Sequence, residues 1–209
     1  MKTALVLGAT GLVGRQMMQQ LLENPAYETV VALVRRPLDV SHSKLRTEII
    51  DFDNPNADQV RGDDMFCALG TTLKAAGSKE AQYRIDCEYP ATLAKIGHKN
   101  GVKKFMLVSS VGADAQSSNF YLRTKGDLEQ QLQAMNFELL VIARPSFLLG
   151  DRKENRVGEK IGIVLAQWLK PLIPKRYQGI QASDVAAALV ATANAEGKGV
   201  RILENEKLS

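Results

Sequence analysis

The feature that most constrains this chain is an apolar run near its N-terminus that leads directly into three evenly spaced glycines. Residues 3–7, Thr-Ala-Leu-Val-Leu, contain no charged residue, which is typical of a parallel strand buried on both faces. Gly8, Gly11 and Gly14 follow, and a helical pattern of apolar residues begins directly behind them. The sequence therefore predicts a strand, a tight glycine turn and the N-terminus of a helix.

Each of the three glycines has its own physical reason. Gly8 lets the chain reverse tightly, Gly11 lets a pyrophosphate approach the backbone, and Gly14 lets the helix pack closely against the sheet. Unpaired N–H groups and partial positive charge at the helix start favour an anion. We therefore predict a bound dinucleotide, with a purely structural tight turn as the alternative. The predicted phosphate loop comprises Gly8, Thr10, Gly11, Leu12, Val13 and Gly14.

Apolar runs typical of strands alternate with helical patterns through the rest of the chain. This alternation predicts an α/β fold, a doubly wound parallel sheet of the Rossmann type, formed by residues 1–209 as a single domain. Residues 144–180 are expected to form a small C-terminal cap for a substrate or a partner. Further strands are predicted at 29–34, 46–51, 65–69, 104–108, 137–143 and 199–203, and helices at 12–24, 78–99 (kinked or broken at Pro90), 121–135, near 159–170 and after a cap at Ser183–Asp184.

The composition is that of an ordinary globular domain, with 45% hydrophobic and 24% charged residues. The net charge of +4 is spread without a long basic block, so no nucleic-acid partner is expected. Cys67 and Cys87 fall in predicted core segments and are expected to be reduced, and His42 and His98 do not suggest a metal site. Because the first strand begins at Thr3 and no apolar run is long enough to span a membrane, we expect a cytoplasmic protein without membrane insertion.

Two arginines at the end of the second predicted strand indicate which dinucleotide binds. An acidic residue at this place accepts hydrogen bonds from the ribose of NAD, but this chain has Arg35 and Arg36. Guanidinium groups can bind a 2′-phosphate, so NADP(H) is favoured over NAD(H); the alternative is that both arginines only add solubility. Asp51 and Phe52 close the third strand, and both are predicted to bind the cofactor. Asp51 either binds adenine or is a solvated turn residue.

Small residues follow the fourth predicted strand. Leu69, Gly70 and Thr71 lie next to the predicted phosphate loop, where they would let a cofactor approach the backbone. We include all three among the predicted cofactor-binding residues.

A Tyr-x-x-x-Lys pair, Tyr121 and Lys125, is the strongest indication of chemistry. The spacing puts both side chains on one helix face. Most such pairs are simply an exposed tyrosine beside an exposed lysine on the surface of a helix. A nearby ammonium lowers the pKa of a tyrosine, about 10 when unperturbed, and so makes it a better acid/base. Lys125 could also bind the nicotinamide ribose, and Ser109 or Ser110, which precede the pair, could orient a carbonyl oxygen.

These motifs together resemble a known superfamily. Residues 8–14 resemble the cofactor loop of the short-chain dehydrogenase/reductases, and the order of serine, Tyr121 and Lys125 matches their catalytic set. Residues 67–72 and 109–126 are similar to the atypical branch that contains the Tat-interacting-protein oxidoreductase homologues. The resemblance implies that Arg144, Pro145 and Ser146 pass the nicotinamide.

The resemblance also implies an activity and an alternative to it. The first is an NADP(H)-dependent oxidoreductase acting on a carbonyl or alcohol substrate, with Tyr121 as acid/base and Lys125 as its modulator. The alternative is an NADPH-binding regulatory protein that acts through a protein partner. The short interval between the serines and Tyr121 favours the alternative, whereas the intact Tyr121–Lys125 pair favours the enzyme. Either a monomer or a homodimer is compatible with the sequence.

Overall fold

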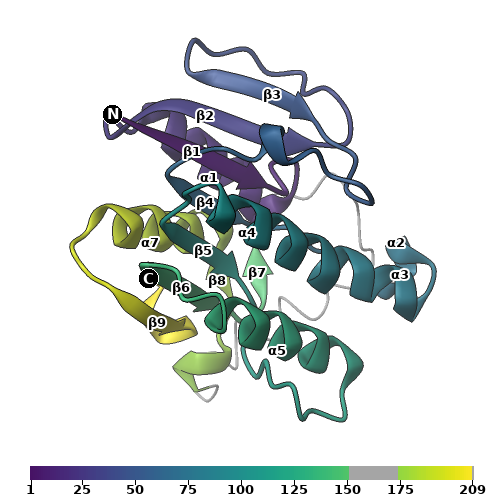
Figure 1. The fold of residues 1–209 in the computed structure, drawn as a ribbon. Coiled ribbons are helices and arrows are strands. Elements are labelled where there is room, and N and C mark those ends of the chain that lie inside the picture. Colours follow the sequence, from purple (N-terminus) through teal and green to yellow (C-terminus); the bar gives the residue numbers. More distant parts are fainter. Residues whose placement is uncertain (151–173, 209) are drawn as a thin grey trace.

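A seven-stranded, wholly parallel sheet forms the centre of the computed structural model, which describes residues 1–150 and 174–208. The strand order is β3-β2-β1-β4-β5-β6-β9, so the chain starts in the middle and builds outward in both directions, as in dinucleotide-binding folds. This confirms the doubly wound Rossmann-type sheet (Figure 1). The strands are β1 Lys2–Leu7, β2 Tyr27–Val34, β3 Leu45–Ile49, β4 Asp64–Cys67, β5 Lys104–Val108, β6 Leu139–Arg144 and β9 Gly199–Glu204.

Side chains of the central strands are buried on both faces of the sheet. Along β1, Ala4 and Val6 belong to one hydrophobic cluster, and Leu5 and Leu7 belong to the other. This alternation follows from the two-residue period of a strand. The continuous apolar run predicted from the sequence is therefore the signature of a strand with helices on both sides.

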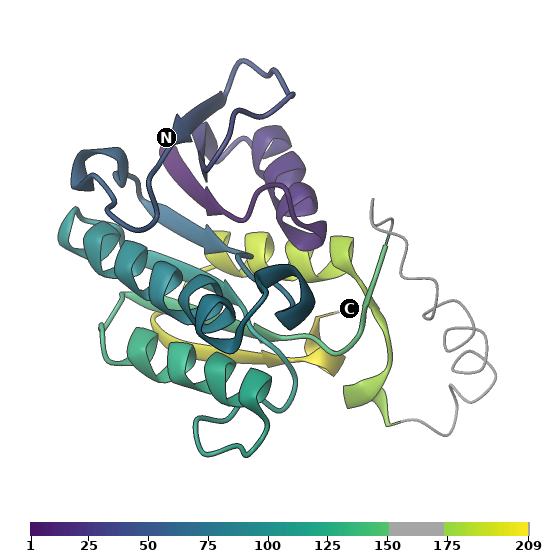
Figure 2. The ribbon, with the colours of Figure 1, turned by 90° about the vertical axis from the view of Figure 1, so that its right-hand side faces the viewer.

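Helices cover both faces of this sheet. Helices α1 (Leu12–Glu23) and α7 (Ala182–Asn194) pack on one face, and α4 (Tyr89–Lys99) and α5 (Phe120–Gln133) pack on the other. Figure 2 shows the two pairs on opposite sides of the strands. The two hydrophobic clusters provide the main driving force for folding, because burial of apolar area is the largest favourable contribution.

The helix predicted at 78–99 is broken into three parts. Helix α3 (Lys79–Tyr83) continues into a π-helical turn at Arg84–Glu88 and then into α4. The Tyr89 N–H donates to the Arg84 carbonyl five residues back, which is the wider spacing of a π-turn. Pro90 lacks an N–H. The expected break is therefore confirmed, but it lies in the turn before the proline.

Several short elements were not predicted. Helix α2 (Leu73–Ala76) follows β4, and β7 (Leu148–Leu149) pairs in parallel with β8 (Ile180–Gln181). This pairing brings the flanks of residues 151–173 together. The helix expected near 159–170, and most of the expected cap, lie outside the described residues.

The start of α7 differs from the expectation. Its N-cap is Gln181 and makes no side-chain capping bond, so the prediction that Ser183–Asp184 would cap the helix was wrong. Ser183 donates instead to Asp184 in the first turn. The chain enters this helix directly from β8, and strand pairing sets the helix start.

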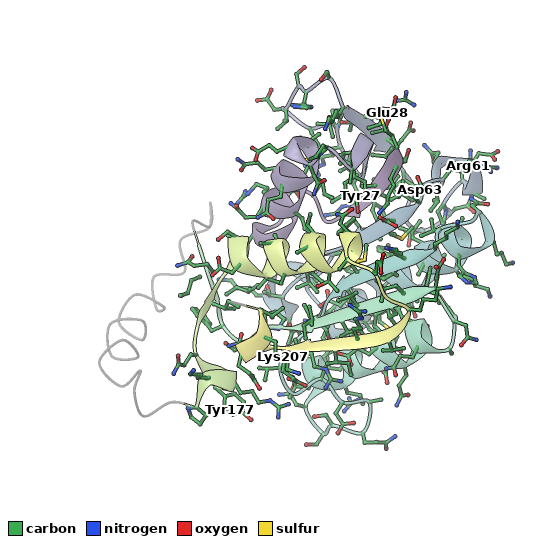
Figure 3. All side chains as sticks on the ribbon, turned by 90° about the vertical axis from the view of Figure 1, so that its left-hand side faces the viewer. Tyr27, Glu28, Arg61, Asp63, Tyr177 and Lys207 are labelled. Atoms are coloured by element: carbon green, nitrogen blue, oxygen red, sulfur yellow. The ribbon has the colours of Figure 1, made fainter. Side chains whose placement is uncertain are left out.

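A buried polar network closes the amino-terminal edge of the sheet. The Tyr27 hydroxyl donates to Asp64 at 2.7 Å, and the Lys2 ammonium pairs with the same carboxylate at 3.1 Å. Figure 3 labels Tyr27 and Asp63 at this edge, and Tyr177 and Lys207 on two short helical turns elsewhere in the molecule. No helix in the described part of the chain is long and apolar enough to cross a membrane.

Candidate functional site

A large cleft lies where the parallel strands β1 and β4 end, at the point from which the strand order builds outward in both directions. Ligands of open α/β sheets bind at this point. The cleft has a volume of about 1080 Å³, and a side pocket of about 150 Å³ adjoins it. The glycine loop and the loop after β4, residues 68–72, contribute to both.

The glycine loop is shaped by close backbone approach. Gly8 has φ +79°, and a Cβ on it would lie 2.6 Å from the Ala68 carbonyl carbon. A Cβ on Gly14 would lie 2.0 Å from the Gly8 carbonyl oxygen, whereas one on Gly11 would lie 3.3 Å from the same oxygen. Gly8 and Gly14 are therefore needed for the fold of the loop, and Gly11 has more room.

The N-terminus of α1 fits an anionic group. Its N-cap residue is Gly11, which has no side chain that could cap the helix, and its first turn has no acidic residue. The N–H groups there are therefore open to a phosphate. Thr10, Leu12 and Val13 line the cleft with Gly11, while Gly14 is buried behind them. A diphosphate therefore fits this end of the cleft.

The side pocket is aromatic and has one arginine in its lining. Arg35 and Phe52 line it together with Tyr89, whose ring centroid is 5.4 Å from that of Phe52. Arg36 and Asp51 are exposed and do not line either cavity. The structure thus distinguishes Arg35, which lines the side pocket, from Arg36, which does not. The sequence alone offers no basis for this distinction.

The predicted acid/base pair lies at the other end of the cleft. Tyr121 is 38% exposed, whereas Lys125 is 4% exposed. The Lys125 ammonium lies 5.9 Å from the centre of the Tyr121 ring and 3.4 Å from Oδ2 of Asp86. Asp86 is fully buried and also accepts the Thr71 N–H at 2.7 Å.

The two charges of this pair affect each other. Burial is the largest single influence and lowers the pKa of Lys125, but Asp86, Tyr121 and Cys67 together outweigh it, so the pKa lies above its usual value. Burial raises the pKa of Asp86, and Lys125 and the Thr71 N–H oppose that rise. Lys125 is therefore an ammonium at neutral pH.

Ser109 and Ser110 both line the cleft, but their hydroxyls have different partners. The buried Ser109 hydroxyl donates to the carboxylate of Glu129. The Ser110 side chain is partly exposed, and within the described ranges its hydroxyl makes only a 3.3 Å contact to the Val111 carbonyl. Ser110 is thus the serine whose hydroxyl is open to a ligand.

The predicted residues at the end of β6 make most of their contacts outside the cleft. Arg144 pairs with Glu129 at 2.5 Å and with Glu204 at 3.2 Å. The hydrogen bonds that it donates to Glu129 in particular raise the pKa of Arg144 above the usual value. The Pro145 carbonyl accepts the Val111 N–H. Of the three predicted residues here, Ser146 lines the cleft, whereas Arg144 and Pro145 do not.

Several residues of this region were missed by sequence reasoning. The only local signal for Asp86 was the expected break near Pro90, since nothing in the sequence shows that an acid in a helix faces a lysine 39 positions later. Leu69, Gly70 and Thr71 were foreseen and line both cavities. The missed lining residues include Thr72, Leu73, Lys79, Gln82, Ile85, Asp86, Tyr89, Phe147 and Leu148.

Both cysteines are buried and free, as expected. Cys67 ends β4, and burial raises the pKa of its thiol to about 11. In the described ranges, no three histidine, cysteine, aspartate or glutamate residues are grouped as they would be around a metal ion.

Comparison with known proteins identifies relatives over most of the chain. The model of the NAD(P)H-binding family matches residues 8–196. The mitochondrial protein FMP52 of Candida albicans is 34% identical over 194 residues, which is 88% of this chain and 85% of that protein. The protein HTATIP2 of Rattus norvegicus is 35% identical over 164 residues, which is 76% of this chain and 67% of that protein.

The relatives correct one expectation. FMP52 proteins from several fungi are named as mitochondrial, so the cytoplasmic location expected from the sequence was wrong. That expectation rested on the absence of a recognisable targeting segment, and this absence does not decide the location of a protein.

Solved structures agree on the fold. A short-chain dehydrogenase/reductase superfamily protein from Agrobacterium tumefaciens with bound NAD has a TM-score of 0.72 at 16% identity, covering 97% of this chain and 77% of that one. At this identity the likeness shows the fold alone. With the family match and the relatives, it leads to one assignment: the chain belongs to the NAD(P)H-binding family, within the atypical short-chain dehydrogenase/reductase group that includes HTATIP2.

Proposed function

We propose that the chain is an NADP(H)-dependent oxidoreductase that interconverts a carbonyl compound and an alcohol. The observation that carries this proposal is that a single cleft gathers the glycine loop, Ser110, Tyr121 and Lys125. These residues come from three separate segments, and each has the chemistry that the reaction needs. When bound, the nicotinamide cofactor supplies or accepts the hydride.

The cofactor would lie along the cleft from the side pocket to Tyr121. The N–H groups at the start of α1 bind the diphosphate, and the rings of Phe52 and Tyr89 border the adenine end. Arg35, which lines the side pocket, binds a 2′-phosphate. Arg36 contributes less, because it lies outside the lining.

Proton transfer belongs to the other end of the cleft. Tyr121 gives its phenol proton to the carbonyl oxygen as the substrate carbon is reduced, and takes a proton back from the alcohol in the reverse reaction. The Lys125 ammonium stabilises the phenolate and donates to the nicotinamide ribose. Ser110 orients the carbonyl oxygen, because the Ser109 hydroxyl is already bound to Glu129.

A regulatory function is the second candidate. Within the described structure, the Tyr121 hydroxyl makes no hydrogen bond to Lys125 or Ser110, which favours a protein that binds NADPH without turnover. A partner protein would then contact the segment 144–180. This candidate shares the cofactor site with the enzyme and differs only in the role of Tyr121.

Nucleotide titrations test the cofactor assignment. We expect wild-type protein to bind NADPH more tightly than NADH. Arg35→Ala should weaken NADPH binding about tenfold, a loss of ~1.4 kcal/mol, while leaving NADH binding nearly unchanged. Arg36→Ala is the matched control and should have the smaller effect. A wild-type preference for NADH would refute the assignment.

A panel of carbonyl substrates, followed by NADPH consumption, tests the reaction. Tyr121→Phe should reduce kcat about 100-fold or more on any substrate that is turned over, without weakening NADPH binding. Ser110→Ala should reduce kcat more than Ser109→Ala does in protein that remains folded. If NADPH binds but no substrate gives turnover that depends on Tyr121, the regulatory function replaces the enzymatic one.

A further inference from the structure

Asp86 is a buried acid with no assigned role in the reaction proposed above. It is fully buried, yet it lines the cleft, and it is the only carboxylate among the described residues that do so. A carboxylate at a site for a diphosphate repels that ligand unless another charge neutralises it. Burying an acid is also costly unless it is paired. Both effects are unfavourable without a compensating partner.

The backbone around Asp86 fixes where its carboxylate lies. Asp86 occupies the π-helical turn Arg84–Glu88, whose wider spacing interrupts the helix at this point. Its Oδ1 accepts the Thr71 N–H at 2.7 Å, which ties the turn to the loop after β4. Two separate elements therefore hold the carboxylate in place.

The other oxygen of Asp86 is directed at Lys125. Oδ2 lies 3.4 Å from the Lys125 ammonium and has no hydrogen bond within the described chain. A Cβ on Gly70 would lie 3.4 Å from that ammonium and 3.6 Å from Oδ2. Because Gly70 has no side chain, its backbone can lie close to the pair.

Three groups act electrostatically on the buried ammonium of Lys125. They are Asp86 from the π-turn, Tyr121 from the same helix and Cys67 from the end of β4. Two further cations line the cleft, Arg15 and Lys79. Asp86 is the only carboxylate among these groups and lies 3.4 Å from the ammonium, so it is the counter-charge for Lys125.

We propose that Asp86 is a positioning residue that keeps the Lys125 ammonium charged and in place beside Tyr121. This inference rests on the proposed function, because the charge of Lys125 matters there for the Tyr121 phenolate and for the ribose. Asp86 does not touch the substrate in this account. It acts only through Lys125.

Asp86→Asn in the full chain is the test. Asparagine keeps the shape and the oxygen that accepts the Thr71 N–H, but it removes the charge. Loss of an opposite charge at this distance should lower the pKa of Lys125 by about 1–3 units. The Lys125 Cε resonance, assigned by its absence in Lys125→Met, reports that pKa in an NMR titration.

The pH dependence of kcat gives a second measurement. In Asp86→Asn, the loss of activity toward alkaline pH should begin at a lower pH than in the wild type, while the two proteins approach each other at lower pH, where Lys125 is protonated in both. Asp127→Asn is the matched control. It removes a carboxylate of α5, whereas the carboxylate that pairs with Lys125 is that of Asp86, so the Lys125 pKa should stay near the wild-type value.

The outcomes separate this proposal from the proposed function. An unchanged Lys125 pKa in folded Asp86→Asn overturns the role of Asp86, even if turnover depends on Tyr121. If the wild type turns over no substrate, the NMR titration still tests Asp86 by itself. If Asp86→Asn does not fold, the NMR titration of Lys125 in the wild-type protein is the test. A Lys125 pKa above the ordinary value of about 10.4 supports the proposal, and one below it overturns the proposal.

Discussion

The glycine-loop end of the cleft presents backbone, whereas the Tyr121 end presents buried charge. At the first end the critical atoms are the N–H groups of α1, brought close by Gly8 and Gly14. At the second end, Lys125 and Asp86 form a buried ion pair, and a second pair, Arg144 and Glu129, lies behind Ser109.

Because of this difference, the two ends are sensitive to different kinds of substitution. A backbone site is damaged by added volume, because there is no room for a Cβ. A site built from paired charges is damaged by removing one partner, because the other charge is left buried.

Glu129→Ala should destabilise the fold most. It removes the carboxylate that pairs with Arg144 and accepts from Ser109, and breaking a buried pair costs about 3–5 kcal/mol. Urea denaturation measures the loss. Glu138→Ala, which removes an exposed partner of Lys198, is the control and should cost at most about 0.5 kcal/mol. Similar losses for both variants would contradict the charge-based account of this end.

Gly14→Ala should lower the free energy of unfolding by about 3 kcal/mol. The added Cβ would lie 2.0 Å from the Gly8 carbonyl oxygen, and both groups are backbone-bound and cannot easily move. Gly11→Ala is the matched variant. It should cost about 1 kcal/mol or less, yet weaken NADPH binding about tenfold. Equal losses of stability would show that the tight approach of Gly14 is not what shapes the loop.

Alkaline pH should destabilise the protein partly through Cys67. Burial raises the pKa of its thiol to about 11, above the unfolded value of about 8.5. The folded state thus holds the thiol proton more tightly than the unfolded state does. The resulting contribution of Cys67 to the free energy of unfolding is fully present below the unfolded pKa. About 3 kcal/mol is lost as pH rises from the unfolded to the folded pKa.

Cys67→Ala tests this expectation. The variant lowers stability at neutral pH through lost packing, so the relevant quantity is the slope of unfolding free energy against pH. Denaturation at a series of pH values should give a shallower alkaline slope for the variant than for the wild type. Equal slopes would exclude Cys67 as the source.

Tyr89→Phe should have the smallest effect. It removes a hydroxyl that donates to Asp53 at 2.7 Å, and the Asp53 side chain is 65% exposed. Water can replace this bond, so the loss should be below about 1 kcal/mol, while the ring remains against Phe52. A loss as large as that of Glu129→Ala, measured by the same denaturation, would remove the distinction between the two ends.

Much of the fold follows from local sequence patterns. Strand β1 and helix α1 lie within a residue of their predicted bounds, because an apolar run followed by glycines and a helical stripe permits few alternatives. The helix at 78–99 was less predictable. Its π-turn depends on contacts of Asp86 with Thr71 and Lys125, and these residues are distant in sequence.

The candidate site divides in the same way. Tyr121 and Lys125 could be identified because their spacing on one helix is visible in the sequence. The choice between Ser109 and Ser110 could not be made, because it depends on Glu129, which is 20 positions from Ser109. The same holds for Arg35 and Arg36, which are adjacent but differ in whether they line the side pocket.

The parallel α/β sheet, the glycine loop and the Tyr121–Lys125 pair could be recognised from the chain alone, because each follows from the identity and spacing of nearby residues. The pairing of Asp86 with Lys125, and of Glu129 with Arg144 and Ser109, became visible only in the folded structure. Charge pairing depends on distance in space, and helix packing across the sheet sets that distance.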